Sequence, residues 1–197
     1  MISIYNIKPK FQQLLRPVLA KLYKMGVTAN GITWSAIVLS FAVGGLFYWK
    51  PSGFMLIVLP VSLLVRMALN ALDGMMAREY KMQSKKGELL NELGDILADI
   101  AMFLPLVLLP GLHPLVLFGF VILGVVNEFT GVLAKAINGE RRYDGPMGKS
   151  DRALLVGLTL LLLYFFPEIK AALNYIFGAG SLLLVISTAV RIKKTLS

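Results

Sequence analysis

Long apolar runs alternate with short polar connections along the whole chain. A helix needs about 20 predominantly apolar residues to cross a bilayer, with roughly 17–25 tolerated. The runs predict an all-α integral membrane protein that forms a single domain over residues 1–197. Six transmembrane helices are expected, at about 31–49, 53–77, 87–109, 114–137, 151–166 and 171–190.

The composition supports a membrane protein and limits its chemistry. Hydrophobic residues make up 57% of the chain and charged residues only 16%, which is too apolar for a soluble domain of 197 residues. Cysteine is absent, so neither disulfide bonds nor thiol chemistry is available to the protein.

Basic residues concentrate in alternate connections between the predicted spans, and these connections lie on one side of the membrane. Connections rich in lysine and arginine stay on the cytoplasmic side of a membrane, so we expect both termini in the cytoplasm. Much of the net charge of +9 therefore reports topology, and no nucleic-acid partner is expected. Every lysine and arginine except Lys50, Arg66 and Lys170 lies in segments 8–24, 78–86, 135–152 and 191–194.

An amphipathic pattern precedes the first span, at residues 7–24. Such a helix can lie in the anionic cytoplasmic interface, and Pro17 is expected to kink or break it. The alternative is a polar lead-in that only follows the positive-inside rule. The apolar positions that can share one helical face are Ile7, Phe11, Leu14, Leu15, Val18 and Leu22.

Polar residues at helical spacing interrupt the second and third predicted spans. One stripe holds Arg66, Asn70, Asp73 and Ala77, and the other holds Glu88, Glu92, Asp95 and Asp99 with Asn91 at its edge. The two spans run in opposite directions, so their stripes can face each other near the cytoplasmic surface. Charge inside a membrane is costly and usually marks a functional site. The alternative is a polar network that only locks the helices together.

The residue types in these stripes suit a ligand that carries phosphate. Several oxygen donors converging from two helices fit a hard cation such as Mg²⁺. Arg78 suits a phosphate because its planar fork binds two oxygens at once. Small residues at 74, 77 and 87 allow close approach to the backbone. Together they indicate a phosphate-bearing ligand held through a metal ion.

The run 70–95 resembles the signature of the CDP-alcohol phosphotransferase family, D-x2-D-G-x2-A-R-x8-G-x3-D-x3-D. Every spacing is kept and six of the eight positions match. The six spans and the interfacial helix extend the resemblance to nearly the whole chain. The runs RMALNALDGMMARE, LNELGD and GPMGKSDRAL resemble a poorly characterised bacterial branch of the family. The signature positions here are Asn70, Asp73, Gly74, Ala77, Arg78, Gly87, Asn91 and Asp95.

The resemblance implies an enzyme of phospholipid synthesis in a bacterial inner (cytoplasmic) membrane. Members of the family move a phosphatidyl or related phosphoalcohol group from a CDP-alcohol to an acceptor hydroxyl and release CMP. The expected partners are therefore a CDP-alcohol lipid, with CDP-diacylglycerol favoured, an alcohol acceptor and membrane lipids. A divalent cofactor, Mg²⁺ or Mn²⁺, and a homodimer are implied in the same way.

The resemblance also implies roles for the signature residues. Asp95 is the expected general base, and the metal ligands are expected at Asn70, Asp73, Asn91 and Asp95. Charge that develops on the phosphoryl oxygens would then be neutralised by the cation. Arg78 is expected to bind the diphosphate. The cytidine pocket is expected to be lined by Gly74, Ala77 and Gly87.

Two departures from the signature lower the charge of the expected site. Asn70 and Asn91 stand where the family has aspartate, and an amide oxygen ligates a cation without adding charge. Asp73 and Asp95 alone balance one divalent ion, so we expect one ion rather than two. The departures also leave an alternative function: a catalytically weak member of the same fold that binds a CDP-lipid or phospholipid without turnover.

Other charged residues near the spans have two readings each. Asp99 can add charge to the metal site or pair with Arg66 across the helices, and we favour the pairing. Glu128 either lines an acceptor pocket or pairs with a basic residue. Lys149 and Arg152 are the candidates for binding the acceptor, because GKSDR resembles a family pattern that binds phosphorylated acceptors.

A small transporter is less favoured as a function. A transport path would need polar residues that continue toward the outer face, and here they become sparse beyond Arg66, Asp99 and Glu128.

Overall fold

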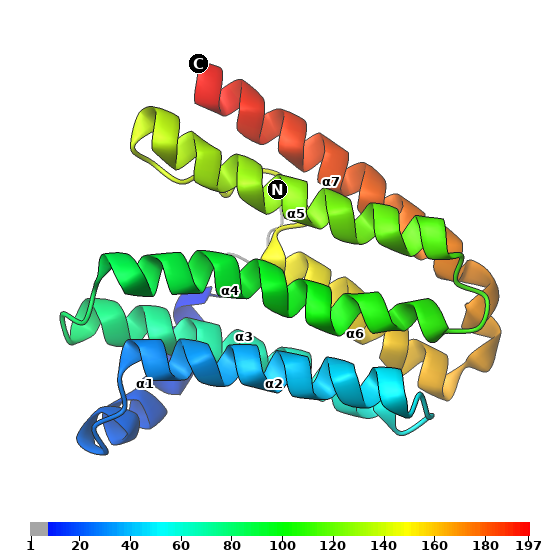
Figure 1. The fold of residues 1–197 in the computed structure, drawn as a ribbon, viewed down its shortest axis with the longest axis horizontal. Helices are drawn as coiled ribbons and strands as arrows, with labels where there is room; N and C mark the ends of the chain where they lie inside the picture. The colour runs from blue at the N-terminus through cyan, green and yellow to red at the C-terminus, as the bar shows by residue number, and fades with distance from the viewer. Residues whose placement is uncertain (1–7) are drawn as a thin grey trace.

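The computed structural model describes residues 8–197, so the predicted start of the interfacial helix at Ile7 lies outside the described residues. Within this range the chain is helical and contains no strand (Figure 1). The elements are α1 Lys8–Lys24, α2 Ala29–Trp49, α3 Met55–Glu79, α4 Lys85–Phe103, η2 Leu104–Leu108, α5 Pro114–Asn138, α6 Lys149–Phe165, η3 Pro167–Ala172 and α7 Leu173–Leu196.

The long helices fall on the apolar runs within a few residues. Among residues 8–197, four segments are long and apolar enough to cross a membrane: α2, α3, α5 and the stretch Pro167–Leu196 that contains α7. Helix α4 carries four acidic and two basic residues, and α6 has only 17 residues. The all-helical membrane fold is thus supported, while membrane crossing by α4 and α6 stays a prediction.

The six helices from α2 to α7 lie side by side, and α1 lies against one end of the bundle (Figure 1). Helix α2 packs on α3 and α4, α3 also packs on α6, and α5 packs on α7. The connection between α3 and α4, the end of α5 and the C-terminus lie at the same end as α1 (Figure 1). The segments rich in lysine and arginine therefore gather at one end of the molecule.

Helix α1 is held on α3 by its apolar face. Leu19 is buried against α3, and the ring of Tyr23 stacks on that of Tyr80 with 3.7 Å between centroids. The helix continues through Pro17, so it is not broken at this residue. Proline removes one backbone hydrogen bond, and the packing of the following turn on α3 keeps the helix together.

Helices α2 and α4 cross at very close range. A Cβ atom added to Gly44 would lie 1.9 Å from the backbone oxygen of Ala101. Small residues permit such approaches between membrane helices, where van der Waals packing supplies much of the stability. Gly44 therefore allows α4 to lie directly on α2.

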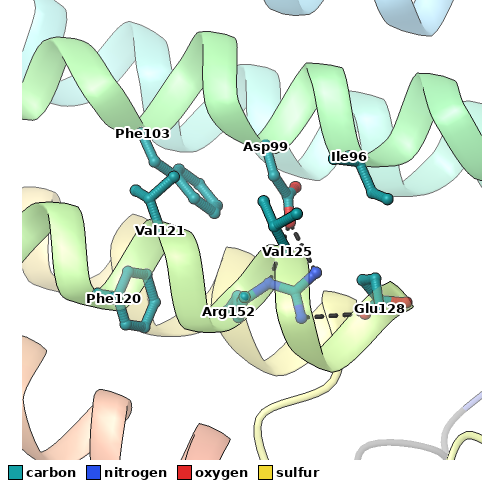
Figure 2. Close-up of a pocket in the computed structure, with 9 residues that line it drawn as sticks. Ile96, Asp99, Phe103, Phe120, Val121, Val125, Glu128 and Arg152 are labelled. Carbon is teal, nitrogen blue, oxygen red and sulfur yellow. Dashed lines mark hydrogen bonds and ion pairs between the residues drawn. The ribbon is translucent and has the colours of Figure 1, made fainter. Parts of the chain in front are cut away.

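A buried ionic network joins α3, α4, α5 and α6, and Figure 2 shows its contacts between Asp99, Arg152 and Glu128. Asp99 of α4 accepts a hydrogen bond from Arg66 of α3 at 2.5 Å, and from Nε and Nη2 of Arg152 of α6 at 3.0 and 2.7 Å. Nη1 of Arg152 donates to Glu128 of α5 at 3.0 Å. Each of the four side chains is buried. The expected pairing of Arg66 with Asp99 is confirmed, and Glu128 pairs with basic residues.

Replacing Gly44 by alanine is expected to lower the stability of the protein by about 1–3 kcal/mol, because the new methyl group overlaps a backbone oxygen. Gly45→Ala is the matched control, since a Cβ at Gly45 meets nothing within 4 Å. Thermal unfolding in detergent measures both variants. Equal midpoints for the two would contradict the close crossing of α2 and α4.

Replacing Arg152 by methionine is expected to cost about 3 kcal/mol, because it removes a buried cation that two buried carboxylates share. Arg16→Met removes an arginine from the solvent-exposed pair with Glu79 and should cost less than about 1 kcal/mol. Denaturant-induced unfolding in detergent compares the two variants. A loss no larger for Arg152→Met than for Arg16→Met would show that the network does not hold the helices.

Candidate active site

The polar stripes of α3 and α4 face each other across one cavity of about 1200 Å³. Residues from α1, α2, α5, α6, α7 and the connections between α3 and α4 and between α5 and α6 complete its wall. The structure thus brings together every signature position from two helices, α3 and α4. The signature residues in the wall are Asn70, Asp73, Gly74, Ala77, Arg78, Gly87, Asn91 and Asp95.

Each signature asparagine hydrogen-bonds to the signature aspartate of the opposite helix. Nδ2 of Asn91 on α4 donates to Oδ2 of Asp73 on α3 at 3.2 Å. Nδ2 of Asn70 on α3 donates to Oδ1 of Asp95 on α4 at 2.9 Å. Four carboxylates at these positions would repel one another, whereas the two amide groups link the helices without added charge.

Asp73 is buried among neutral donors. Besides Asn91, its Oδ2 accepts a hydrogen bond from Oγ1 of Thr33 on α2 at 2.9 Å. Within residues 8–197, its Oδ1 accepts no hydrogen bond from another side chain. The sequence did not assign this role to Thr33, for which the available signal was a hydroxyl at the polar start of an otherwise apolar span.

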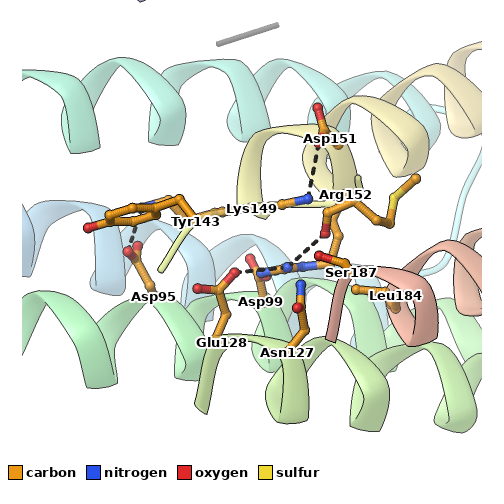
Figure 3. A network of polar contacts seen from close by, with 12 residues as sticks. Asp95, Asp99, Asn127, Glu128, Tyr143, Lys149, Asp151, Arg152, Leu184 and Ser187 are labelled. Carbon is orange, nitrogen blue, oxygen red and sulfur yellow. Dashed lines mark hydrogen bonds and ion pairs between the residues drawn. The ribbon is translucent and has the colours of Figure 1, made fainter. Parts of the chain in front are cut away.

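Asp95 is surrounded by positive charge. Its Oδ2 forms an ion pair with Nζ of Lys149, which reaches it from the first turn of α6 (Figure 3). Nη2 of Arg66 donates to the Asp95 backbone oxygen at 3.1 Å and lies 3.7 Å from Oδ1. With Asn70 also on Oδ1, both carboxylate oxygens of Asp95 have partners.

Small residues and one arginine form the mouth of the cavity at the ends of α3 and α4. Arg78 is exposed in the last turn of α3 and lies over Gly74, where an added Cβ would be 3.2 Å from its Nη1. An added Cβ at Gly87 would lie 2.6 Å from Oδ1 of Asn30. The backbone amide of Gly87 donates to Oγ of Ser84, which caps α4. The mouth of the cavity therefore carries small side chains and one exposed positive charge.

The two candidate acceptor residues have different surroundings. Lys149 lines the large cavity, where it contacts Asp95. Arg152 is only 2% exposed and is not part of that wall. Its guanidinium is held by Asp99, Glu128 and the Met147 carbonyl oxygen, beside a separate small cavity (Figure 2). The contacts of Arg152 are those of a residue that joins helices.

Two further arginines line the cavity, and sequence reasoning counted them only as topology signals. Arg141 bridges Glu92 and Glu128 at 2.9 and 2.7 Å, and its guanidinium stacks over the Tyr143 ring at 4.6 Å. Arg191 of α7 is 1% exposed and donates to the backbone oxygens of Asn127 and Asp144. No residue spacing marked either one.

The connection between α5 and α6 positions Arg141. Gly139 and Gly145 adopt positive φ angles of +78° and +91°, which glycine adopts without strain. These turns let residues 139–148 fold back toward α7, where Ser187 donates to the Asp144 backbone oxygen at 3.2 Å. A connection that folds into the bundle brings its basic residues to the cavity.

Oxygen donors of the kind that a hard cation prefers lie around Asp73. No group of three or more His, Cys, Asp or Glu side chains suited to a metal occurs within residues 8–197. Asp73, Asp95 and the amide oxygens of Asn70 and Asn91 are nevertheless oxygen donors of the kind that Mg²⁺ and Mn²⁺ prefer. Two carboxylates supply enough charge for one divalent ion.

The chain is similar to known proteins over almost its whole length. The inner membrane protein YnbA of Escherichia coli (strain K12) is 43% identical over 195 residues, which cover 99% of this chain and 97% of that protein. Phosphatidylinositol phosphate synthase PgsA1 of Mycobacterium tuberculosis, solved with CDP-DAG bound, has the same fold, with a TM-score of 0.78, 21% identity and 94% of each chain covered.

A second structure of PgsA1, in complex with manganese and citrate, gives a TM-score of 0.77 at 21% identity, with 92% of this chain and 88% of that chain covered. A family model for CDP-alcohol phosphatidyltransferases matches residues 26–190, a range that includes the whole signature. The chain therefore belongs to the CDP-alcohol phosphatidyltransferase family.

Proposed function

We propose that the protein transfers a phosphatidyl or related phosphoalcohol group from a CDP-alcohol to an acceptor hydroxyl and releases CMP. The observation that carries the proposal is the single cavity in which Asp73, Asp95 and Arg78 meet. Membership of the family supports a role in phospholipid synthesis. The inner-membrane relative supports a multi-pass protein of the bacterial inner membrane, with the basic end of the bundle in the cytoplasm.

The donor is proposed to be CDP-diacylglycerol, which is bound in one of the PgsA1 structures. Arg78 would bind the diphosphate, and Gly74, Ala77 and Gly87, which line the same cavity, would border the cytidine. The same cavity has an apolar wall that includes Leu64 of α3, and this side chain is 62% exposed on the bundle surface. The acyl chains can therefore remain among membrane lipids while the diphosphate enters the cavity.

In the proposed reaction Asp95 accepts the proton of the acceptor hydroxyl. The acceptor oxygen then forms a bond to the phosphorus that carries the alcohol group, and the bond from that phosphorus to the leaving CMP oxygen breaks. A divalent ion, Mg²⁺ or Mn²⁺, would neutralise charge on the phosphoryl oxygens. The candidate ligands for this ion are the carboxylates of Asp73 and Asp95 and the amide oxygens of Asn70 and Asn91.

The basic wall favours an acceptor that carries an anionic group. Lys149, Arg141 and Arg191 reach the cavity from three different segments. Arg191 contacts backbone oxygens, which leave its positive charge without a carboxylate in direct contact. We therefore assign acceptor binding to these three residues and assign Arg152 to the network that joins the helices.

A second candidate function is binding of a CDP-lipid or phospholipid without turnover. Asn70 and Asn91 favour it, because their amide groups donate to the two aspartates and replace charge that would bind cations. The two candidates differ in one measurable respect, which is the release of CMP.

Purified protein incubated with labelled CDP-diacylglycerol, Mn²⁺ and a panel of free and phosphorylated alcohols is expected to release CMP. Asp95→Ala should lower the rate at least about a hundredfold, because general-base catalysis contributes roughly 10²- to 10⁴-fold. Asp144→Ala is the control, since this acid pairs with Lys194 and does not line the cavity. Nucleotide binding without CMP release from the wild type under any condition would establish the binding function instead.

Restoring aspartate at both Asn70 and Asn91 is expected to raise the affinity for Mn²⁺ at least tenfold and to admit a second ion. The change adds two carboxylates to a donor set that balances one divalent ion. Titration of Mn²⁺ followed by electron paramagnetic resonance measures number and affinity. Two tightly bound ions in the wild type would contradict the expected count.

A further inference from the structure

The two signature aspartates differ in the charge of their partners. Asp73 accepts hydrogen bonds from Thr33 and Asn91, which are neutral, and both reach the same oxygen. Asp95 has an ammonium group on Oδ2, supplied by Lys149, and an amide and a guanidinium near Oδ1. One half of the site is therefore supplied with positive charge by the protein, and the other half is not.

The position of Lys149 is fixed by the start of α6. Gly148 precedes the helix, and its backbone amide donates to Oδ2 of Asp151 at 3.0 Å, which closes the first turn. Arg152 follows Lys149 by three residues, so both side chains point to the same side of α6. Because Arg152 is held by Asp99, one turn beyond Asp95 on α4, Lys149 is directed at Asp95 itself (Figure 3).

We propose that the Lys149 ammonium is a built-in counter-cation of Asp95 that confines the divalent ion to the Asp73 half of the site. The inference rests on the proposed function and adds where positive charge lies between the two signature aspartates. The family signature has four carboxylates, enough for two divalent ions. This chain has two, of which Asp95 is paired with Lys149 and only Asp73 lacks a cation in contact with it.

The pairing has a consequence for catalysis. Asp95 can accept a proton from the acceptor only when one of its oxygens is released. Phosphate oxygens of a bound substrate offer Lys149 another partner, and its flexible side chain, 30% exposed to the cavity, can turn to them without movement of α6. The Lys149 ammonium group thus changes partner, from the Asp95 carboxylate in the free protein to a phosphate oxygen of the bound substrate.

The proposal predicts competition between Lys149 and metal ions for Asp95. We would titrate Mn²⁺ into the purified full chain in detergent, without donor or acceptor, and follow free Mn²⁺ by electron paramagnetic resonance. The wild type should bind one ion. Lys149→Met should bind a second ion, or bind the first at least tenfold more tightly, because Oδ2 of Asp95 becomes available.

Lys135→Met is the matched control. Lys135 lines the same cavity but forms its ion pair with Glu88, so this variant removes an equal charge without freeing Asp95. Its affinity for Mn²⁺ should stay within about twofold of the wild type, because exposed charges act weakly at a distance in salt. Lys149→Gln, which retains a polar side chain, should reproduce Lys149→Met if the latter does not fold.

Equal Mn²⁺ binding by the Lys149 and Lys135 variants, or no Mn²⁺ binding by the wild type and either Lys149 variant, would overturn the proposal. The assay contains no substrate, so its result does not depend on transfer activity. If the protein releases CMP but its Mn²⁺ binding does not change on loss of Lys149, the counter-cation role is disproved and the proposed transferase function stands. If the protein never releases CMP but binds a second Mn²⁺ ion on loss of Lys149, the counter-cation role stands and the transferase function fails.

Discussion

The structure depends on the cost of placing charge inside an apolar helix bundle. Asp99 is buried between helices, and it is stabilised because Arg66 of α3 and Arg152 of α6 each donate to one of its two oxygens. A buried carboxylate without such partners would be strongly destabilising. The pairing therefore ties α3, α4 and α6 together at one depth. Asp95 lies one turn away on α4, so the same contacts hold it facing the cavity.

The same constraint explains the chemistry of the cavity wall. Three acids of the wall, Asp95, Glu92 and Glu128, each form an ion pair with a lysine or an arginine. Asp73 instead accepts hydrogen bonds from the neutral side chains of Thr33 and Asn91. The two asparagines thus redistribute charge within the family fold and leave the fold itself unchanged.

Much of the fold could be predicted from the sequence, because helix length and apolar periodicity are local properties. The spacing of Asn70, Asp73, Asn91 and Asp95 likewise predicted a shared site, since two antiparallel helices bring such stripes together. The contacts of Lys149 and Arg152 could not be separated in advance. Both belong to one short basic segment, and only the packing of α6 shows which one reaches the cavity and which one joins the helices.

Arg141, Arg191 and Thr33 were missed as members of the site for a related reason. The place of Arg141 depends on a connection that folds back at two glycines, and that of Arg191 on how α7 packs against α5. Thr33 meets Asp73 only because α2 packs on α3. Contacts between segments distant in sequence carry no periodic signal, so single-sequence reasoning had little to detect.

Crystals of the protein grown with CDP-diacylglycerol and Mn²⁺ would locate nucleotide and metal together, with anomalous scattering to identify manganese. We expect cytidine against Gly74 and Gly87, the diphosphate in contact with Arg78, and one manganese peak beside Asp73. Nucleotide bound outside the cavity between α3 and α4, or two manganese ions bridging Asp73 and Asp95, would contradict this expectation.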